Sequence, residues 1–139
     1  MHILLVKQDW KTEDTCGQCC VAMLLQISKT KAVQAIGHKN ATKSSELRRA
    51  LQLHEMRIGS RLRKFIDFDN VSDTAILLGE WRRGKNKCQH WVVWSAPYLY
   101  DPIEGVLKVD ARVRPSHFRP THYLPVRGAD GRGSGKSRV

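Results

Sequence analysis

The sequence predicts an α+β domain in which N-terminal helices are followed by an antiparallel β-sheet. Apolar side chains recur at helical spacing within residues 14–53, behind residues that favour helix starts. From residue 74 the pattern changes to runs rich in strand-forming residues, separated by turn residues. Helices first and an antiparallel sheet afterwards are typical of the α+β class.

The chain is expected to begin with a short strand and then a helix. Residues 2–6 (HILLV) indicate a short strand or an extended lead-in, and the polar stretch 8–15 indicates a loop. Asp14 and Thr15 are both good N-cap residues, because their side-chain oxygens can accept hydrogen bonds from unpaired backbone N–H groups. Apolar side chains at positions 21, 24, 25 and 27 then predict a helix with a buried stripe.

Two further helices are expected before the middle of the chain. Residues 30–37 (TKAVQAIG) indicate a short helix that ends at Gly37, since glycine readily adopts the left-handed conformation of a helix end. Residues 44–53 (SSELRRALQL) repeat leucine and alanine at helical spacing, and Ser44 or Ser45 could cap that helix.

The second half of the chain indicates antiparallel strands. Residues 74–82 (TAILLGEWR) and 89–96 (QHWVVWSA) flank the turn-like stretch RGKNK, which predicts a β-hairpin. Residues 97–111 (PYLYDPIEGVLKVDA) predict a strand, an Asp-Pro turn and another short strand. Residues 121–127 (THYLPVR) could supply a last strand.

Length and composition favour one domain in the cytoplasm. The chain has 139 residues, of which 41% are hydrophobic, and this suits a single core. We expect residues 1–127 to form the domain and the Gly/Ser-rich basic stretch 128–139 to be a disordered tail. No apolar run approaches the roughly 20 residues that a bilayer requires, and the N-terminus does not resemble a secretory signal. Cysteines in a cytoplasmic protein are expected to be reduced.

Three of the four cysteines lie within five residues, in the stretch EDTCGQCCVAM. Cys16 falls at the start of the first expected helix, where the helix dipole and unpaired backbone N–H groups favour a thiolate. A thiolate is the nucleophilic form of cysteine. Gly17 would allow a substrate backbone to approach closely. Cys19 and Cys20 lie deeper in the helix, where a packing role is the simpler explanation.

A nucleophilic cysteine needs a base, and His90 is the best candidate. It stands at the start of the apolar run HWVVW. An imidazole in this role needs an acceptor that orients it, and Asp101 at the end of the next expected strand could lie beside it. Cys88 would point to the same face of the strand as His90. Equally, His90 could be a plain structural histidine and Asp101 could simply start the Asp-Pro turn.

The combination of TCGQCCVAM, HWVVW and YDP resembles the papain-like cysteine peptidases, across roughly residues 5–105. Within that group it is most similar to the bacteriocin leader-peptide (double-glycine) peptidases and their stand-alone bacterial and phage relatives. The resemblance implies a papain-like fold and a thiol protease without cofactor or metal. It also implies that Cys16 is the nucleophile, that His90 is the general base and acid, and that Asp101 orients the imidazole.

The resemblance further implies that an upstream glutamine stabilises the oxyanion, and the matching residue is Gln8. Gln8 lies eight residues before Cys16, about two more than is usual in the family, so a two-residue loop insertion is expected. The backbone N–H of Cys16 would be the second donor. Gln18 is a fallback donor only in principle, because helix geometry would point it elsewhere. Trp91, a core or cleft-wall residue, is a candidate for substrate binding together with Gly17.

The expected reaction is acyl transfer from a peptide or isopeptide bond, with other amides or thioesters possible on the same groups. A zinc-stabilised adaptor is an alternative, because Cys16 and Cys19 form a Cys-x-x-Cys and Cys88 and His90 form a Cys-x-His.

A third interpretation is a basic binding module on an inactive papain-like fold. Lysine and arginine number 24 against 13 acidic residues, a net charge of +11, and such a surface attracts nucleic acid or acidic proteins. Residues 61–64, 81–87 and 111–120 are rich in cations, and 81–87 and 111–120 also contain aromatic residues. The same cations could instead recruit an acidic protein substrate to a protease site. The oligomeric state is not indicated.

Overall fold

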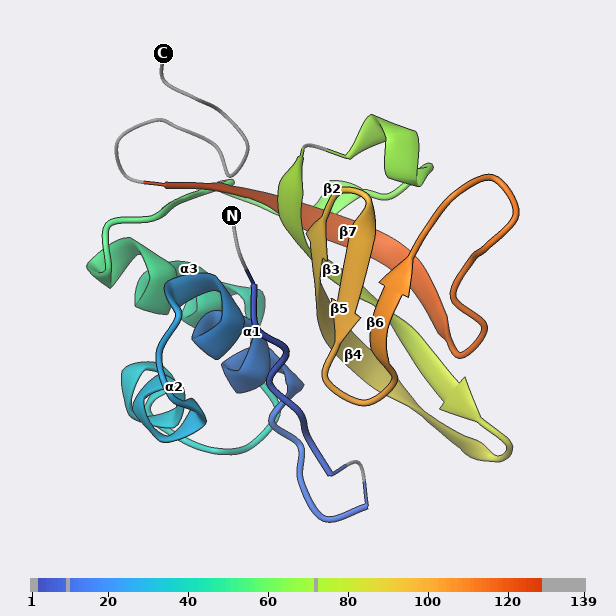
Figure 1. The fold of residues 1–139 in the computed structure, drawn as a ribbon. Coiled ribbons are helices and arrows are strands. Elements are labelled where there is room, and N and C mark those ends of the chain that lie inside the picture. Colours follow the sequence, from blue (N-terminus) through green and yellow to red (C-terminus); the bar gives the residue numbers. More distant parts are fainter. Residues whose placement is uncertain (1–2, 10, 72, 129–139) are drawn as a thin grey trace.

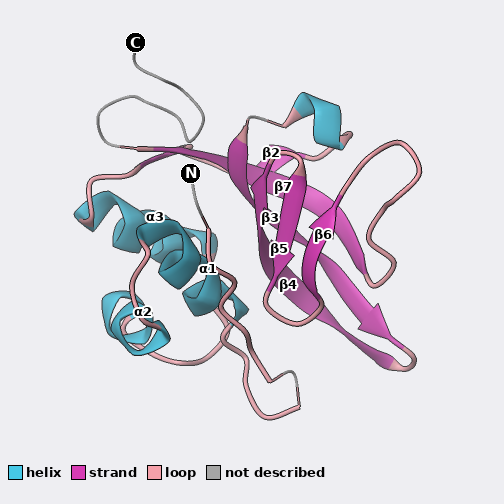
Figure 2. Ribbon diagram, viewed as in Figure 1, coloured by secondary structure: helices cyan, strands magenta, loops and turns pink. Residues whose placement is uncertain are grey.

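The computed structural model describes residues 3–9, 11–71 and 73–128. Helices gather on one side of an antiparallel sheet, so the α+β class with helices packed on a sheet is confirmed (Figure 1, Figure 2). The helices are α1 (Cys16–Leu25), α2 (Lys29–Ile36) and α3 (Ser44–Leu53), and a 3₁₀ turn η1 covers Phe68–Asn70. None of the helices in the described ranges has the length and apolar character needed to cross a membrane.

The helix boundaries follow the sequence closely, but two of the expected caps differ. Thr15 holds the N-cap position of α1 without a side-chain hydrogen bond. α1 begins after Thr15, and α2 ends at Gly37, which has a φ of 103°. The expected serine cap of α3 is wrong: the N-cap position is held by Lys43, whose backbone N–H donates to Oε1 of Glu46 at 2.9 Å. A glutamate in the first turn therefore caps α3 from inside the helix, and this interaction is also favourable with the helix dipole.

Of the two expectations for the N-terminus, a short strand or an extended lead-in, no strand is formed over the described residues 3–6. The strands are β1 (Arg57–Ile58), β2 (Arg63–Lys64), β3 (Thr74–Arg83), β4 (Asn86–Ser95), β5 (Tyr98–Asp101), β6 (Gly105–Lys108) and β7 (Phe118–Arg127). They pair in the order β1-β7-β3-β4-β5-β6, and β2 also pairs with β7. The hairpin and the strand–turn–strand that follows it are therefore confirmed. The two-residue strands β1 and β2 were not expected.

The sheet is buried on both faces, which explains why its central strands lack a polar side. Trp91 and Val93 of β4 join the helices in one core, whereas Val92 and Trp94 lie in a second core on the opposite face. Residues from η1 and from the segments before and at the start of β7 cover that second core. Successive side chains of a strand point to opposite faces, so a strand covered on both faces becomes a continuous apolar run.

Of the expected basic tail, only Gly128 is described. Residues 129–139 lie outside the described ranges, and their expected disorder remains a prediction.

Candidate active site

His90 and Asp101 form a buried hydrogen-bonded pair. Nε2 of His90 lies 2.6 Å from Oδ1 of Asp101, and the two side chains are 1% and 4% exposed. β4 and β5 run antiparallel with Val93 opposite Tyr100, and this register brings the end of β5 beside the part of β4 that carries His90. The same Oδ1 also accepts the backbone N–H groups of Ile103 and Glu104, at 2.8 and 3.2 Å. Asp101 therefore both initiates the Asp-Pro turn and contacts the imidazole.

Cys16 meets the same imidazole from the helical layer. It is the first residue of α1 and is only 4% exposed, and its thiol lies close enough to the imidazole to help raise the pKa of His90. Because Asp101 occupies Nε2 of His90, Nδ1 is the ring nitrogen left for the thiol. Three residues that are far apart in the chain, Cys16, His90 and Asp101, are thus brought together at one place in the fold.

The surroundings of His90 favour its protonated form. Burial by itself lowers the pKa of this imidazole, but the hydrogen bond to Asp101 and the interactions with the charges of Asp101 and Cys16 outweigh it and raise the pKa to about 9. An imidazolium at neutral pH can both stabilise a neighbouring thiolate and deliver a proton. The arrangement is therefore suited to a cysteine nucleophile that works with a histidine acid.

Two aromatic rings enclose the histidine, and sequence reasoning did not identify either as part of the site. The ring centroids of Trp81 and Phe118 lie 6.5 and 5.8 Å from that of His90. Trp81 is 2% and Phe118 is 4% exposed. They keep water from the His90–Asp101 hydrogen bond, which is stronger in a medium of low dielectric constant.

Glu104 connects this aromatic wall to the Asp101 turn. Its Oε2 accepts the indole N–H of Trp81 at 2.8 Å, and Arg83 donates to both carboxylate oxygens at 2.9 Å. Its backbone N–H donates to Asp101. The sequence signal for Glu104 is its place three residues after Asp101. Such a spacing is common in turns and does not by itself indicate a site residue.

The residues between Gln8 and Cys16 form a self-closed loop. The carbonyl of Asp9 accepts the backbone N–H groups of Thr12 and Glu13, and Nε2 of Gln8 donates to the carbonyl of Glu13 at 2.8 Å. The backbone N–H of Gln8 donates to the carbonyl of Pro102. The longer spacing is thus accommodated by this loop, and Gln8 stays next to the turn that carries Asp101. Its role towards an oxyanion remains a prediction.

The loop between α2 and α3 is anchored at Thr42 by three residues of the sequence motifs. A Cβ atom on Gly17 would lie 2.6 Å from Cβ of Thr42. Oε1 of Gln18 accepts from the Thr42 hydroxyl at 3.0 Å, and the indole N–H of Trp91 donates to the Thr42 carbonyl at 3.0 Å. Gly17 and Trp91 are both buried, so close packing explains their identity, and their contact with substrate remains a prediction.

Replacing Gln18 with alanine is expected to lower the free energy of unfolding by about 2–3 kcal/mol. Gln18 is 0% exposed, and its Nε2 donates to the carbonyls of His38 and Asn40 at 2.8 and 3.0 Å. The substitution leaves these groups without their donor. Urea unfolding measures the effect, with Gln52→Ala on the exposed side of α3 as the control. An equal change in both variants would contradict a structural role for Gln18.

The remaining cysteines differ sharply from one another. Cys19 and Cys20 are fully buried, and burial raises the pKa of Cys19 to about 11 and that of Cys20 well above its usual value. Cys20 is a packing group, and the thiol of Cys19 donates to the carbonyl of Lys7 at 3.6 Å. Cys88 is exposed, and its pKa is raised by partial desolvation and by the negative charge of nearby groups.

Among residues 3–9, 11–71 and 73–128, no cluster of three or more histidine, cysteine or acidic side chains could hold a metal ion, so the zinc adaptor lacks a ligand set there.

No protein-family model and no curated protein matches the sequence. Among solved structures, the peptidase domain of Streptococcus ComA, a bifunctional ABC transporter involved in a quorum-sensing pathway, is similar with a TM-score of 0.61. The match covers 90% of this chain and 98% of that domain, at 16% sequence identity. The resemblance to the double-glycine cysteine peptidases that the sequence motifs indicate is therefore confirmed at the level of the fold: the chain has the fold of a ComA-type peptidase domain.

Proposed function

We propose that the chain is a cysteine peptidase in which Cys16, His90 and Asp101 act together. The observation that carries this proposal is the buried His90 imidazole, which is hydrogen-bonded to Asp101 at 2.6 Å and whose pKa the nearby Cys16 thiol helps to raise. A structural histidine needs no thiol on its second nitrogen. The fold of a peptidase domain over nearly the whole chain adds support.

The proposed reaction has two acyl-transfer steps. The Cys16 thiolate attacks the carbonyl carbon of a peptide or isopeptide bond, and His90 gives its proton to the nitrogen of the leaving amine. A thioester to Cys16 remains. Water then attacks this thioester while His90 accepts a proton, and the carboxylic acid leaves as the thiolate is restored. Asp101 holds the ring orientation and stabilises the imidazolium in both steps.

The oxyanion of each tetrahedral intermediate is proposed to bind at the start of α1. That helix has no side-chain N-cap hydrogen bond, so its first N–H groups are suited to a developing negative charge. We propose the backbone N–H of Cys16 as one donor and Gln8 as the other. Gln8 is anchored to the carbonyl of Pro102, and its Nε2 has a second hydrogen beyond the one given to Glu13.

The proposal predicts selective alkylation of Cys16 near neutral pH. Iodoacetamide should label Cys16 at about pH 6–7, well below the range in which an ordinary thiol reacts. Peptide mass spectrometry at several pH values locates the label. Exposed Cys88 is the internal comparison, because its raised pKa delays its reaction. His90→Ala should remove the selectivity. If Cys16 and Cys88 were labelled at the same rate, and only above about pH 8.5, the enzyme proposal would fail.

A further inference from the structure

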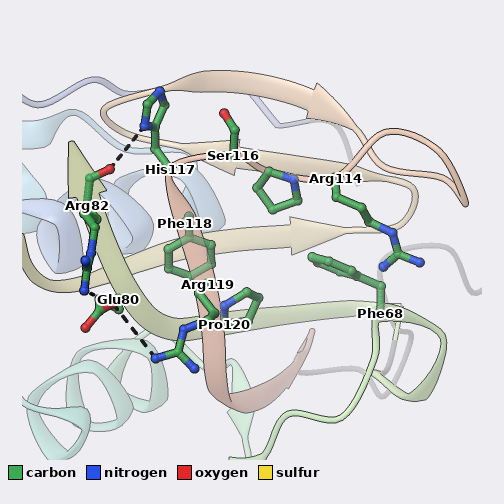
Figure 3. Close-up of a pocket in the computed structure, with 10 residues that line it drawn as sticks. Phe68, Glu80, Arg82, Arg114, Ser116, His117, Phe118, Arg119 and Pro120 are labelled. Atoms are coloured by element: carbon green, nitrogen blue, oxygen red, sulfur yellow. Dashed lines mark hydrogen bonds and ion pairs between the residues drawn. The ribbon is translucent and has the colours of Figure 1, made fainter. Parts of the chain in front are cut away.

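We infer that a pocket beside the candidate active site binds an acidic segment of the peptide substrate. The pocket has a volume of about 580 Å³ and lies between the end of β3, the segment 114–117 and the start of β7 (Figure 3). The inference rests on the proposed peptidase function for its link to catalysis. The binding of an acidic peptide can be measured without any cleavage.

The pocket has an apolar base and a cationic rim. The rings of Phe68 and Phe118 form part of its lining, and Arg82, Arg114 and Arg119 surround them from three different parts of the chain (Figure 3). The side chains of Arg82, Arg114 and Arg119 are 59%, 47% and 73% exposed, respectively. An extended peptide could therefore place an apolar side chain on the base and carboxylates against the rim.

Positive charge on this rim exceeds the negative charge that the protein itself supplies. Glu80 is the acidic residue in the lining, and it is shared by Arg82 at 3.3 Å, Lys87 at 3.5 Å and Arg119 at 3.9 Å. Across the pocket, Arg114 has one ion pair, with Asp67 at 3.1 Å. Each guanidinium has five N–H donors in a fork that fits carboxylates. Donors on the exposed rim thus remain available for an incoming acidic side chain.

The aromatic residues favour a peptide over a nucleic acid. Binding of single strands uses exposed rings on which bases stack, but Phe68 is 8% and Phe118 is 4% exposed. Phe68 packs against Trp94 and lies under the Arg114 guanidinium, and Phe118 packs against His90. Each of the two residues exposes less than a tenth of its surface, which is too little for the full face that a stacked base covers. The base of the pocket is suited to apolar side chains rather than to stacked bases.

A second, smaller hollow lies between this pocket and the turn that carries Asp101. It has a volume of about 190 Å³, shares residues 114–118 with the larger pocket, and is also lined by Asp101 and Glu104. A peptide segment held on the arginine rim would therefore lie next to the turn that carries Asp101. Such binding should lower KM for acidic substrates and leave kcat nearly unchanged, because the rim does not touch the reacting groups.

The test uses the full chain with Cys16→Ala and fluorescein-labelled peptides of about ten residues, each with a central leucine between glutamates or between glutamines. Fluorescence anisotropy should show the acidic peptide binding at least about tenfold more tightly than its neutral counterpart, and less tightly as salt rises from about 50 to 200 mM. The double variant Arg114→Gln/Arg119→Gln should lose this preference. Arg57→Gln/Arg127→Gln, at the far end of β7, changes net charge equally and should keep it.

Three results would overturn the inference: equal binding of both peptides, equal loss of binding in both double variants, or tighter binding of a labelled single-stranded DNA at the same arginines. The proposed function fails separately. If Cys16→Ala binds the acidic peptide as expected but the wild-type chain cleaves no peptide, the acidic-segment site stands and the peptidase proposal falls. If wild type cleaves acidic and neutral peptides with equal kcat/KM, the peptidase stands and the inferred site falls.

Discussion

Replacing Cys16 with alanine is expected to abolish peptide hydrolysis and to leave the fold intact. Without the thiol no acyl-enzyme can form, so kcat/KM should fall by at least about 10³-fold. Alanine favours a helix, and it is a small apolar residue that can occupy the buried position of Cys16, which is 4% exposed. We therefore expect a change of only about 1 kcal/mol in the free energy of unfolding. Initial rates on a cleavable peptide and urea unfolding curves measure the two effects.

Cys88→Ala is the matched control for this substitution. Cys88 is another free thiol near His90, but it is exposed and lies on β4, two residues before His90. Its removal should leave kcat/KM within about twofold of the wild-type value. Activity that persisted in Cys16→Ala and disappeared in Cys88→Ala would show that Cys88, and not Cys16, is the nucleophile.

Replacing Asp101 with asparagine is expected to lower kcat/KM by about 10²–10⁴-fold, as loss of the orienting carboxylate does in triads of this kind. The side-chain oxygen of asparagine can still accept the backbone N–H groups of Ile103 and Glu104, so the turn should persist. The negative charge that stabilises the imidazolium is lost. The effect should therefore lie in catalysis and not in folding.

The same substitution should change the pH dependence in a defined direction. The pKa of His90 is raised to about 9, so the proton-donating imidazolium of the wild type persists at neutral pH and is lost as pH rises through about 9. In Asp101→Asn, burial still lowers the pKa of His90, but the charged partner that raises it is lost, so the pKa of His90 must fall. The alkaline limb of kcat/KM should then move to lower pH, and NMR titration of the imidazole should follow it.

Asp110→Asn separates turn formation from the effect on His90. Asp110 likewise accepts two backbone N–H groups, from Arg112 and Val113, at an exposed turn without a histidine partner. It should leave the pH profile unchanged. An identical shift of the profile in both variants would mean that the charge of the whole protein, and not the Asp101 contact, sets the pKa of His90.

Local patterns predicted the elements well where a residue acts alone. Gly37 ends α2 because its conformation is available to glycine regardless of the rest of the fold. The residues after Met1 and His2 show the opposite case. Ile3, Leu4 and Leu5 have strand-like side chains, yet no strand forms over residues 3–6. A strand needs a partner to pair with, and side-chain type alone does not supply one.

The candidate site shows the same division. The residues themselves indicated Cys16, His90 and Asp101 as nucleophile, base and orienting acid, since each stood at the end of an expected element. Trp81 and Glu104 were not identified, because an aromatic residue in a strand and a glutamate in a turn are common. Their indole–carboxylate hydrogen bond spans 23 positions of the chain and exists only once β3 and the Asp101 turn lie together.

The sequence by itself determined the fold class, the helix ends, the hairpin and the residue types that could perform acyl transfer, because these depend on spacing and local conformational preference. Only the tertiary structure decided that Asp101 lies 2.6 Å from His90, that the loop after Gln8 closes on itself, and that arginines from separate segments gather around one pocket. Such contacts depend on strand register and chain reversal. They are set by the packing of the whole core, which no short stretch of the sequence encodes.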